Sequence, residues 1–424
     1  MTSALRPTGQ GTGTGAAKRP VLDRTVLRLV FLIPGGLSLL LGLNAALQLL
    51  GVWAPLSFAR LGELHAPLMV FGFVGTLVLL ERAVAARRAW GFASPALLGL
   101  GSLALLAPLP DAVGKAMIGT GFVVLLGVYL VIWRRSPAAA IDIQILGAVA
   151  GLATTILWGA GVEIWALVPG MAVFLILTIA GERLELARIS PVMNSRGEAL
   201  GFAVSLLLVA MAAIAPIWPD TGFRLLGVAL GLLVAWLFAY DVATRLVGTS
   251  GLPRYMAACL LAGYLWLLVP SVVWLIVGKV TDGPLTHTGL YDATLHAIFL
   301  GFVMSMIMAH APVILPAVLR KPLPYRSFLY IPVALLHLSL VIRLLGGDAW
   351  GSIDAVRWGG ALNVIAVLLF VVLAIVSAVM GAPKPAATLA PKLTPRLTPK
   401  LAPKLTPKIE SREGQQLPAN AGIC

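Results

Sequence analysis

The sequence predicts an all-α polytopic membrane protein with twelve transmembrane helices and with both ends on the inner side of the membrane. The first observation is composition: 59% of the 424 residues are hydrophobic and only 11% are charged, with a mean hydropathy of +0.96. The second is a series of apolar runs of about 20 residues, the length that crosses a hydrocarbon core. The third is charge placement, because 25 of the 31 Lys and Arg residues fall in segments on the side of the N-terminus. Such asymmetry indicates a cytoplasmic N-terminus and C-terminus.

The expected helices are the apolar windows between turn residues and charge clusters. They cover approximately residues 26–50, 64–83, 93–110, 113–133, 140–159, 161–181, 199–218, 221–244, 255–278, 291–319, 326–345 and 356–380. Together they form a predicted transmembrane domain over residues 25–381.

Two terminal segments fall outside that domain. We expect residues 1–24 to be a disordered basic segment, and residues 382–424 to be a disordered cytoplasmic tail in which Pro and Lys recur in motifs such as LTPK. The net charge of +14 follows the topology and favours anionic lipid headgroups. It does not indicate nucleic-acid binding. The expected location is the plasma membrane of a prokaryote.

The five histidines are informative because ionisable groups inside a span usually face the bundle interior. His65 opens the second span and His296 opens the tenth, so both are expected near the outer leaflet. His310 follows towards the inner leaflet, His337 lies near the middle of the eleventh span, and His287 lies in an outer loop. Two histidines at matching depth on different spans suggest a shared site.

A pair of neutral imidazoles in an apolar bundle suits the two axial positions of haem iron. Small residues near the two histidines would make room for a flat macrocycle: Ala66, Gly72, Gly75, Ala297 and Gly301. The alternative is that these small residues pack helices and that each histidine makes an interhelical hydrogen bond.

Two strings carry a family resemblance. His65 to Phe73 reads HAPLMVFGF, which resembles the HAHEMLFGF-type segment of the NnrS family of haem- and copper-containing membrane proteins. His296 to Ala309 reads HAIFLGFVMSMIMA, which is similar to a later NnrS segment. The resemblance implies a twelve-span protein that binds haem b through His65 and His296 and takes part in the response to nitric oxide or its handling.

The same two positions are similar to the main subunit of the heme-copper oxidases, where histidines on spans 2 and 10 ligate a low-spin haem. The oxidase copper site has no counterpart, because the sixth span has no histidine and the seventh has no His-His pair. Pro67 and Leu68 replace the second His and the Glu of the NnrS string, so the resemblance does not support copper there either.

Other polar residues have expected roles near this site. Asp292 stands one helical turn before His296 and is expected either to accept its ring N–H or to cap the span. Arg343 is expected either to neutralise a haem propionate or to extend to the headgroups. Glu81 with Arg82, and Tyr240 with Asp241, stand at inner span ends, where interfacial anchors are expected.

His310 and His337 lie on consecutive spans and leave three interpretations open. They could form a second metal or haem site, relay protons, or make hydrogen bonds between helices. For the whole protein, three functions remain in competition: an NnrS-type haem protein that handles a diatomic gas, a haem electron-transfer subunit without gas chemistry, and a twelve-span secondary transporter.

Overall fold

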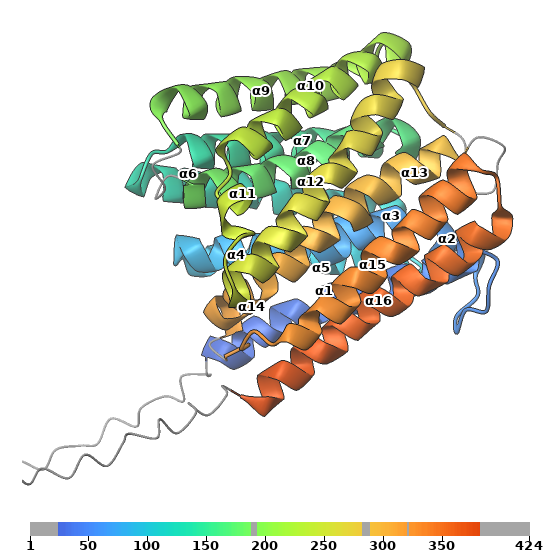
Figure 1. The fold of residues 1–424 in the computed structure, drawn as a ribbon, viewed down its shortest axis with the longest axis horizontal. Helices are drawn as coiled ribbons and strands as arrows, with labels where there is room; N and C mark the ends of the chain where they lie inside the picture. The colour runs from blue at the N-terminus through green and yellow to red at the C-terminus, as the bar shows by residue number, and fades with distance from the viewer. Residues whose placement is uncertain (1–23, 188–192, 282–288, 320–321, 382–424) are drawn as a thin grey trace, which may run out of the picture. The chain divides into compact units, whose positions relative to one another are not determined.

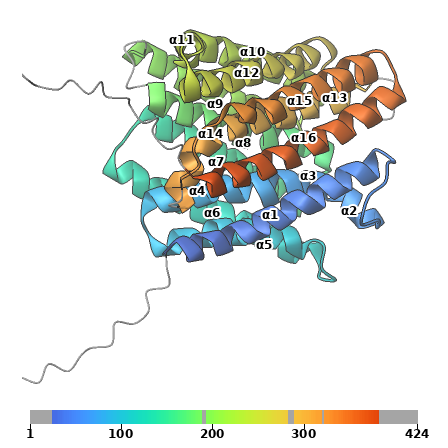
Figure 2. The same ribbon diagram turned by 60° about the horizontal axis from the view of Figure 1, so that its bottom comes forward.

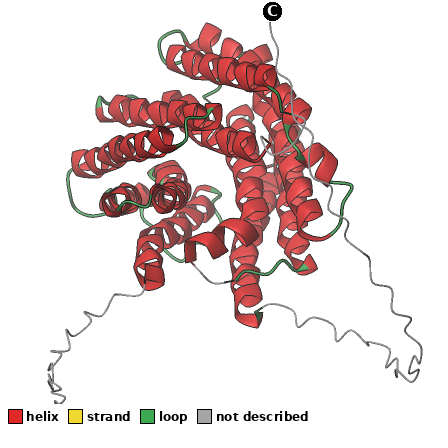
Figure 3. Ribbon diagram, turned by 90° about the vertical axis from the view of Figure 1, so that its left-hand side faces the viewer, coloured by secondary structure: helices red, strands yellow, loops and turns green. Residues whose placement is uncertain are grey.

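The protein is helical throughout the part of the chain that the computed structural model describes, which comprises residues 24–187, 193–281, 289–319 and 322–381 (Figure 1). Every regular element in these ranges is a helix (Figure 3). The expected disordered segments at residues 1–24 and 382–424 lie outside the described residues, apart from Arg24, which begins the first helix. His287 also lies outside them.

The first half of the chain contains the following helices: α1 (Arg24–Leu49), α2 (Ala59–Glu63), α3 (His65–Pro67), η1 (Leu68–Gly75), α4 (Thr76–Ala86), η2 (Ala89–Phe92), α5 (Ala93–Ala104), α6 (Asp111–Arg135), α7 (Ala139–Gly159) and α8 (Ile164–Ala187). The second half contains α9 (Ser195–Ile214), α10 (Pro219–Tyr240), α11 (Ala243–Leu246), α12 (Gly251–Val277), α13 (Leu290–His296), η3 (Ala297–Met304), α14 (Ser305–Leu319), η4 (Ser327–Leu329), α15 (Tyr330–Val341), η5 (Ile342–Ala349) and α16 (Ile353–Met380).

Eleven helices among the described residues are long and apolar enough to cross a membrane, so the chain is a helical membrane protein. Three of these spans are continuous through a π-helical segment: His65–Ala86, Leu290–Pro316 and Ser327–Ala349. The expected span at residues 93–110 is shorter than predicted, because the apolar helix there covers only Ala89–Ala104. Pro108 and Pro110 follow it, and a proline disfavours helical conformation in the residue before it.

The centre of the bundle is α8, which is apolar on every side as far as Gly181 and is buried along nearly its whole length. It packs against α7 and α9 and also contacts η3. The outer helices leave one face exposed, as expected for contact with lipid. The first and last long helices, α1 and α16, lie side by side (Figure 2).

Two buried ion-pair networks tie neighbouring ends of the helices together. Asp241 accepts hydrogen bonds from Arg183 Nε at 2.7 Å and from the Tyr264 hydroxyl at 2.7 Å. Arg82 donates to Glu81 at 2.6 Å and to Glu182 at 2.8 Å. The expectation that Arg82 and Asp241 anchor the helices at the membrane surface was therefore wrong, because their exposed fractions are only 8% and 3%. Both find partners on distant helices, which removes them from the interface.

We predict that Asp241→Asn will destabilise the protein by about 3–5 kcal/mol, because it leaves the buried Arg183 guanidinium without a counter-charge. The measurement is thermal or chemical unfolding of the purified protein in detergent. The matched control is Asp220→Asn, an exposed residue in the first turn of the same helix, which should cost no more than about 1 kcal/mol. Equal losses in the two variants would contradict the structural role of the pair.

Candidate functional site

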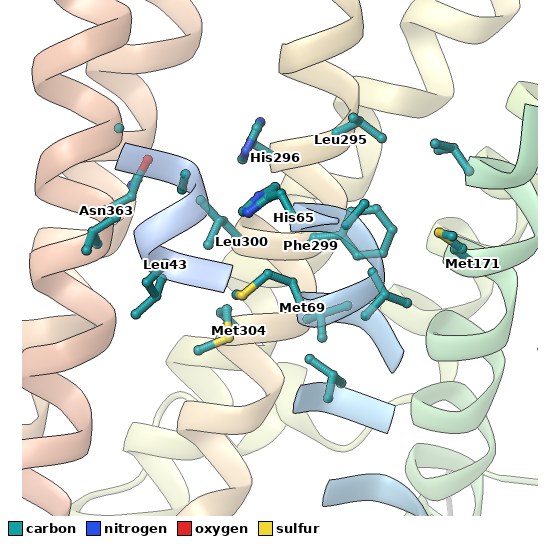
Figure 4. Close-up of a pocket in the computed structure, with 18 of the residues that line it drawn as sticks. Leu43, His65, Met69, Met171, Leu295, His296, Phe299, Leu300, Met304 and Asn363 are labelled. Atoms are coloured by element: carbon teal, nitrogen blue, oxygen red, sulfur yellow. The ribbon is translucent and has the colours of Figure 1, made fainter. Parts of the chain in front are cut away.

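His65 and His296 line one pocket inside the bundle, between α1, the His65–Ala86 span, the Leu290–Pro316 span, η5 and α16 (Figure 4). Its empty volume is about 880 Å³, a figure that includes the space at its open mouth. Besides the two imidazoles and Arg343, the lining is almost entirely apolar, with the thioethers of Met69 and Met304 below the rings in Figure 4. The structure thus brings together two histidines that are 231 positions apart in the sequence.

The hydrogen bonds of these imidazoles define which ring nitrogen carries the proton. His65 Nδ1 lies 2.8 Å from the backbone oxygen of Gly42, and His296 Nδ1 lies 2.9 Å from the backbone oxygen of Asp292. A carbonyl oxygen can only accept, so Nδ1 is the donor in both rings. In the neutral imidazole Nε2 then keeps its lone pair. Two nitrogen lone pairs are therefore available to a Lewis acid in this pocket.

Asp292 connects His296 to Arg343. One carboxylate oxygen, Oδ1, lies 2.9 Å from His296 Nδ1, and the guanidinium of Arg343 donates to both oxygens at 2.7 Å. Asp292 is 2% exposed and Arg343 is 5% exposed, so the bidentate pair lies in the protein interior. A carboxylate behind the ring fixes the orientation of an imidazole and raises its basicity as a ligand. Arg343 does not extend to the headgroups and also lines the pocket.

A π-helical segment adjoins His65, His296 and Arg343. η1 begins three residues after His65, η3 begins immediately after His296, and Arg343 is the second residue of η5. The π-helix is rare, and it is found frequently at functional sites because its wider turn redirects side chains. No feature of the residue pattern predicted these segments.

The small residues near the histidines mostly pack helices. A Cβ atom at Gly72 would lie 2.5 Å from Ser38 Oγ, and one at Gly301 would lie 2.4 Å from the Trp266 ring. A Cβ at Gly75 would lie 2.8 Å from a Leu98 methyl group. Of the five small residues considered from the sequence, Ala66 lines the pocket, whereas Ala297, Gly72, Gly75 and Gly301 do not.

His310 belongs to the ion-pair network of Arg183 and Asp241. Its Nδ1 lies 2.8 Å from the Met306 backbone oxygen and therefore donates, and its Nε2 accepts from Arg183 Nη1 at 2.9 Å. Both ring nitrogens are thus engaged within the protein. Ligation of a metal by His310 would require that the bond from Arg183 be broken.

His337 is held in a separate network on α15. The Trp266 indole, which can only donate, lies 2.9 Å from Nδ1, so the proton of the neutral ring is on Nε2. Nε2 lies 3.5 Å from Ser305 Oγ. His337 has no hydrogen bond in common with His310. The arrangement favours hydrogen bonding between helices as the role of both residues.

Sequence reasoning missed Asn363, which lines the pocket from α16. Its amide nitrogen donates to Ser339 Oγ at 2.6 Å, whereas its Oδ1 is buried and has no hydrogen-bond partner among the described residues. The available signal was a single amide side chain within the apolar run at residues 356–380. A buried polar group of this kind usually has a partner, so the unpaired Oδ1 of Asn363 is an exception among the described residues.

Fold and site together define a helical membrane protein whose bundle encloses an apolar, histidine-lined pocket. The chain belongs to the family described as a domain of unknown function (DUF8744), which it matches over residues 28–379. That match includes His65, His296 and Arg343. None of the curated proteins compared with the chain matches it.

We predict that Asp292 and Arg343 stabilise the protein as a unit. Asp292→Asn and Arg343→Met should each destabilise it by several kcal/mol, because each single change leaves one buried partner uncompensated. The double variant should lose less free energy of unfolding than the two single variants lose together. The difference, which is the coupling energy, should be about 1–3 kcal/mol.

The control for this double-mutant cycle is the exposed pair of Asp354 and Arg357, whose charged atoms are 3.9 Å apart. Its coupling should be below about 0.5 kcal/mol. Additive losses at Asp292 and Arg343 would show that the buried pair does not act as a unit.

Proposed function

We propose that the protein binds haem b in the membrane and that His65 and His296 are its two axial ligands. The observation that carries the proposal is that both imidazoles line one apolar pocket with Nδ1 donating to a carbonyl oxygen, so both Nε2 lone pairs are left for the iron. When bound, haem would supply one-electron chemistry and a site for a diatomic gas.

The remaining polar groups of the pocket suit the same cofactor. Arg343 uses Nε and Nη2 to bind Asp292, which leaves Nη1 for a propionate carboxylate. Asp292 holds His296 from the side opposite to Nε2. The apolar lining suits the macrocycle, which is mostly hydrocarbon. The donor set is therefore consistent with haem, whereas nothing in it calls for copper.

The proposed membrane arrangement has twelve spans, with the shorter Ala89–Ala104 helix as the third. An even number of crossings puts both termini on one side, and the excess of Lys and Arg indicates that this side is the cytoplasm. We propose the plasma membrane of a prokaryote as the location. His65 and His296, at the start of inward-running spans, would then lie near the outer face.

For the physiological role, we propose a part in the nitric oxide response or its handling, on the basis of the two strings that resemble NnrS. A haem electron-transfer subunit is the second candidate, because two histidine ligands fill both axial positions and leave no site for a gas. Gas binding would require one imidazole to leave. Titration of the reduced protein with nitric oxide separates the two, since only the first role predicts a spectral shift.

We predict about one haem per chain in the purified protein and a low-spin absorbance spectrum. His65→Ala and His296→Ala should each abolish that spectrum, because each removes an axial nitrogen, while the protein still inserts into the membrane. His337→Ala is the matched control, since it removes a half-buried imidazole whose two nitrogens already have partners within the protein. Its haem content should equal that of the parent.

Haem content is measured from the pyridine haemochrome, and insertion is measured by the amount of protein in the membrane fraction. Unchanged haem in both alanine variants would rule out the proposed ligands. If the protein shows no Soret band even after haem is supplied during expression, the secondary transporter is the candidate function that remains.

A further inference from the structure

A second cavity lies next to the histidine pocket, between α1, α4, α8, α14 and α16. Its empty volume is about 1640 Å³, including its open mouth, and most of its lining is aliphatic or aromatic. The two cavities share three lining residues, Val74, Val303 and Met304. These three side chains therefore lie between the histidine pocket and a molecule in the second cavity.

The cavity is accessible from the lipid side. Gly36 on α1 is exposed and Ile375 on α16 is 58% exposed, and both residues line the cavity. A ligand that enters here must be soluble in the bilayer and must carry a long apolar portion.

The polar part of the lining is acidic. Glu81 and Glu182 face the cavity from the C-terminal halves of α4 and α8. One oxygen of each accepts from Arg82, and within the described residues the second oxygen of each is available to a ligand. Arg82 is engaged by Glu81 and Glu182, so its guanidinium is not left unpaired to attract a phosphate or a fatty-acid carboxylate. His310 also lines the cavity, but both of its nitrogens are engaged.

We propose that this cavity binds a long-chain quinol, with the quinol hydroxyl groups donating to the free oxygens of Glu81 and Glu182. A quinol is neutral, carries two hydroxyl donors and has an isoprenoid chain, so it matches an acidic, apolar cavity that opens to lipid. Its use as an electron donor to the neighbouring pocket rests on the proposed haem function, whereas its binding does not.

The test uses the full-length protein in detergent with decylubiquinol, kept reduced under anaerobic conditions, and with decylubiquinone. Equilibrium dialysis measures the affinity for each. The wild type should prefer the quinol by about tenfold, because quinone carbonyls only accept and cannot pair with a carboxylate. Glu182→Gln should remove most of that preference, since an amide can also donate to the quinone.

A second variant tests the cavity itself. A Cβ at Gly36 would meet nothing within 4 Å, so Gly36→Trp should fill the cavity without disturbing the helix and should abolish binding of both forms. Ile33→Trp is the matched control on the same helix, because Ile33 is 57% exposed and does not line the cavity. Its affinities should equal those of the wild type.

Equal affinities for quinol and quinone in the wild type, or binding that survives Gly36→Trp, would overturn the proposal and leave a cavity filled by lipid chains. The assay is independent of haem, so His65→Ala protein should bind the quinol normally. Wild-type protein that lacks haem but prefers the quinol would contradict only the proposed function, and wild-type protein that holds haem but shows no such preference would contradict only this inference.

Discussion

The ion pair between Asp292 and Arg343 is the interaction on which the histidine pocket depends. Two unit charges removed from water cost several kcal/mol each, and only close bidentate contact with good hydrogen-bond geometry offsets that cost. The two residues belong to α13 and η5, so the pair holds the tenth and eleventh predicted spans at a fixed separation. Because Asp292 also contacts His296, the same pair sets the position of one ring, while the Gly42 carbonyl on α1 sets the other. The pocket therefore has its polar atoms held by three different helices.

The π-helical segments give a backbone reason for how three helices can converge in this way. In a regular α-helix, each residue after His65 would be rotated by about 100° about the helix axis relative to the one before it. That rotation would fix the direction in which the apolar side chains below the ring point. A segment with wider turns shifts this register once, so the residues on either side of it need not share one helical face. In this bundle the shift occurs just below His65 and just below His296, where Met69 and Met304 turn towards the pocket. The π-helical backbone is less favourable than an α-helix, and close packing of neighbouring helices, as at Gly72 and Gly301, offsets this.

Hydropathy alone predicted the positions of the long helices well, because length and apolarity are the properties that a membrane selects. It overestimated α5, where the residues after Ala104 are apolar but include two prolines that end the helix. Histidine depth predicted that His65 and His296 would share a site, since the start of a span defines its height in the bilayer. The partners of Arg82, Arg183 and Asp241 were not predictable in this way. They lie on helices that are distant in sequence, and a charge near a span end looks the same whether it faces headgroups or a partner inside the bundle.

The central position of α8 has a consequence for how the protein is made. Glu182 and Arg183 are adjacent on this helix, and the acceptor of Arg183 is Asp241, which lies 58 positions later in the chain. His310, the other partner of Arg183, lies 127 positions later. When α8 first enters the membrane, its arginine has neither partner, so insertion relies on the long apolar stretch that precedes the charges. Closure of the bundle around α8 must then be a late event in biogenesis, one that waits for helices not yet synthesised.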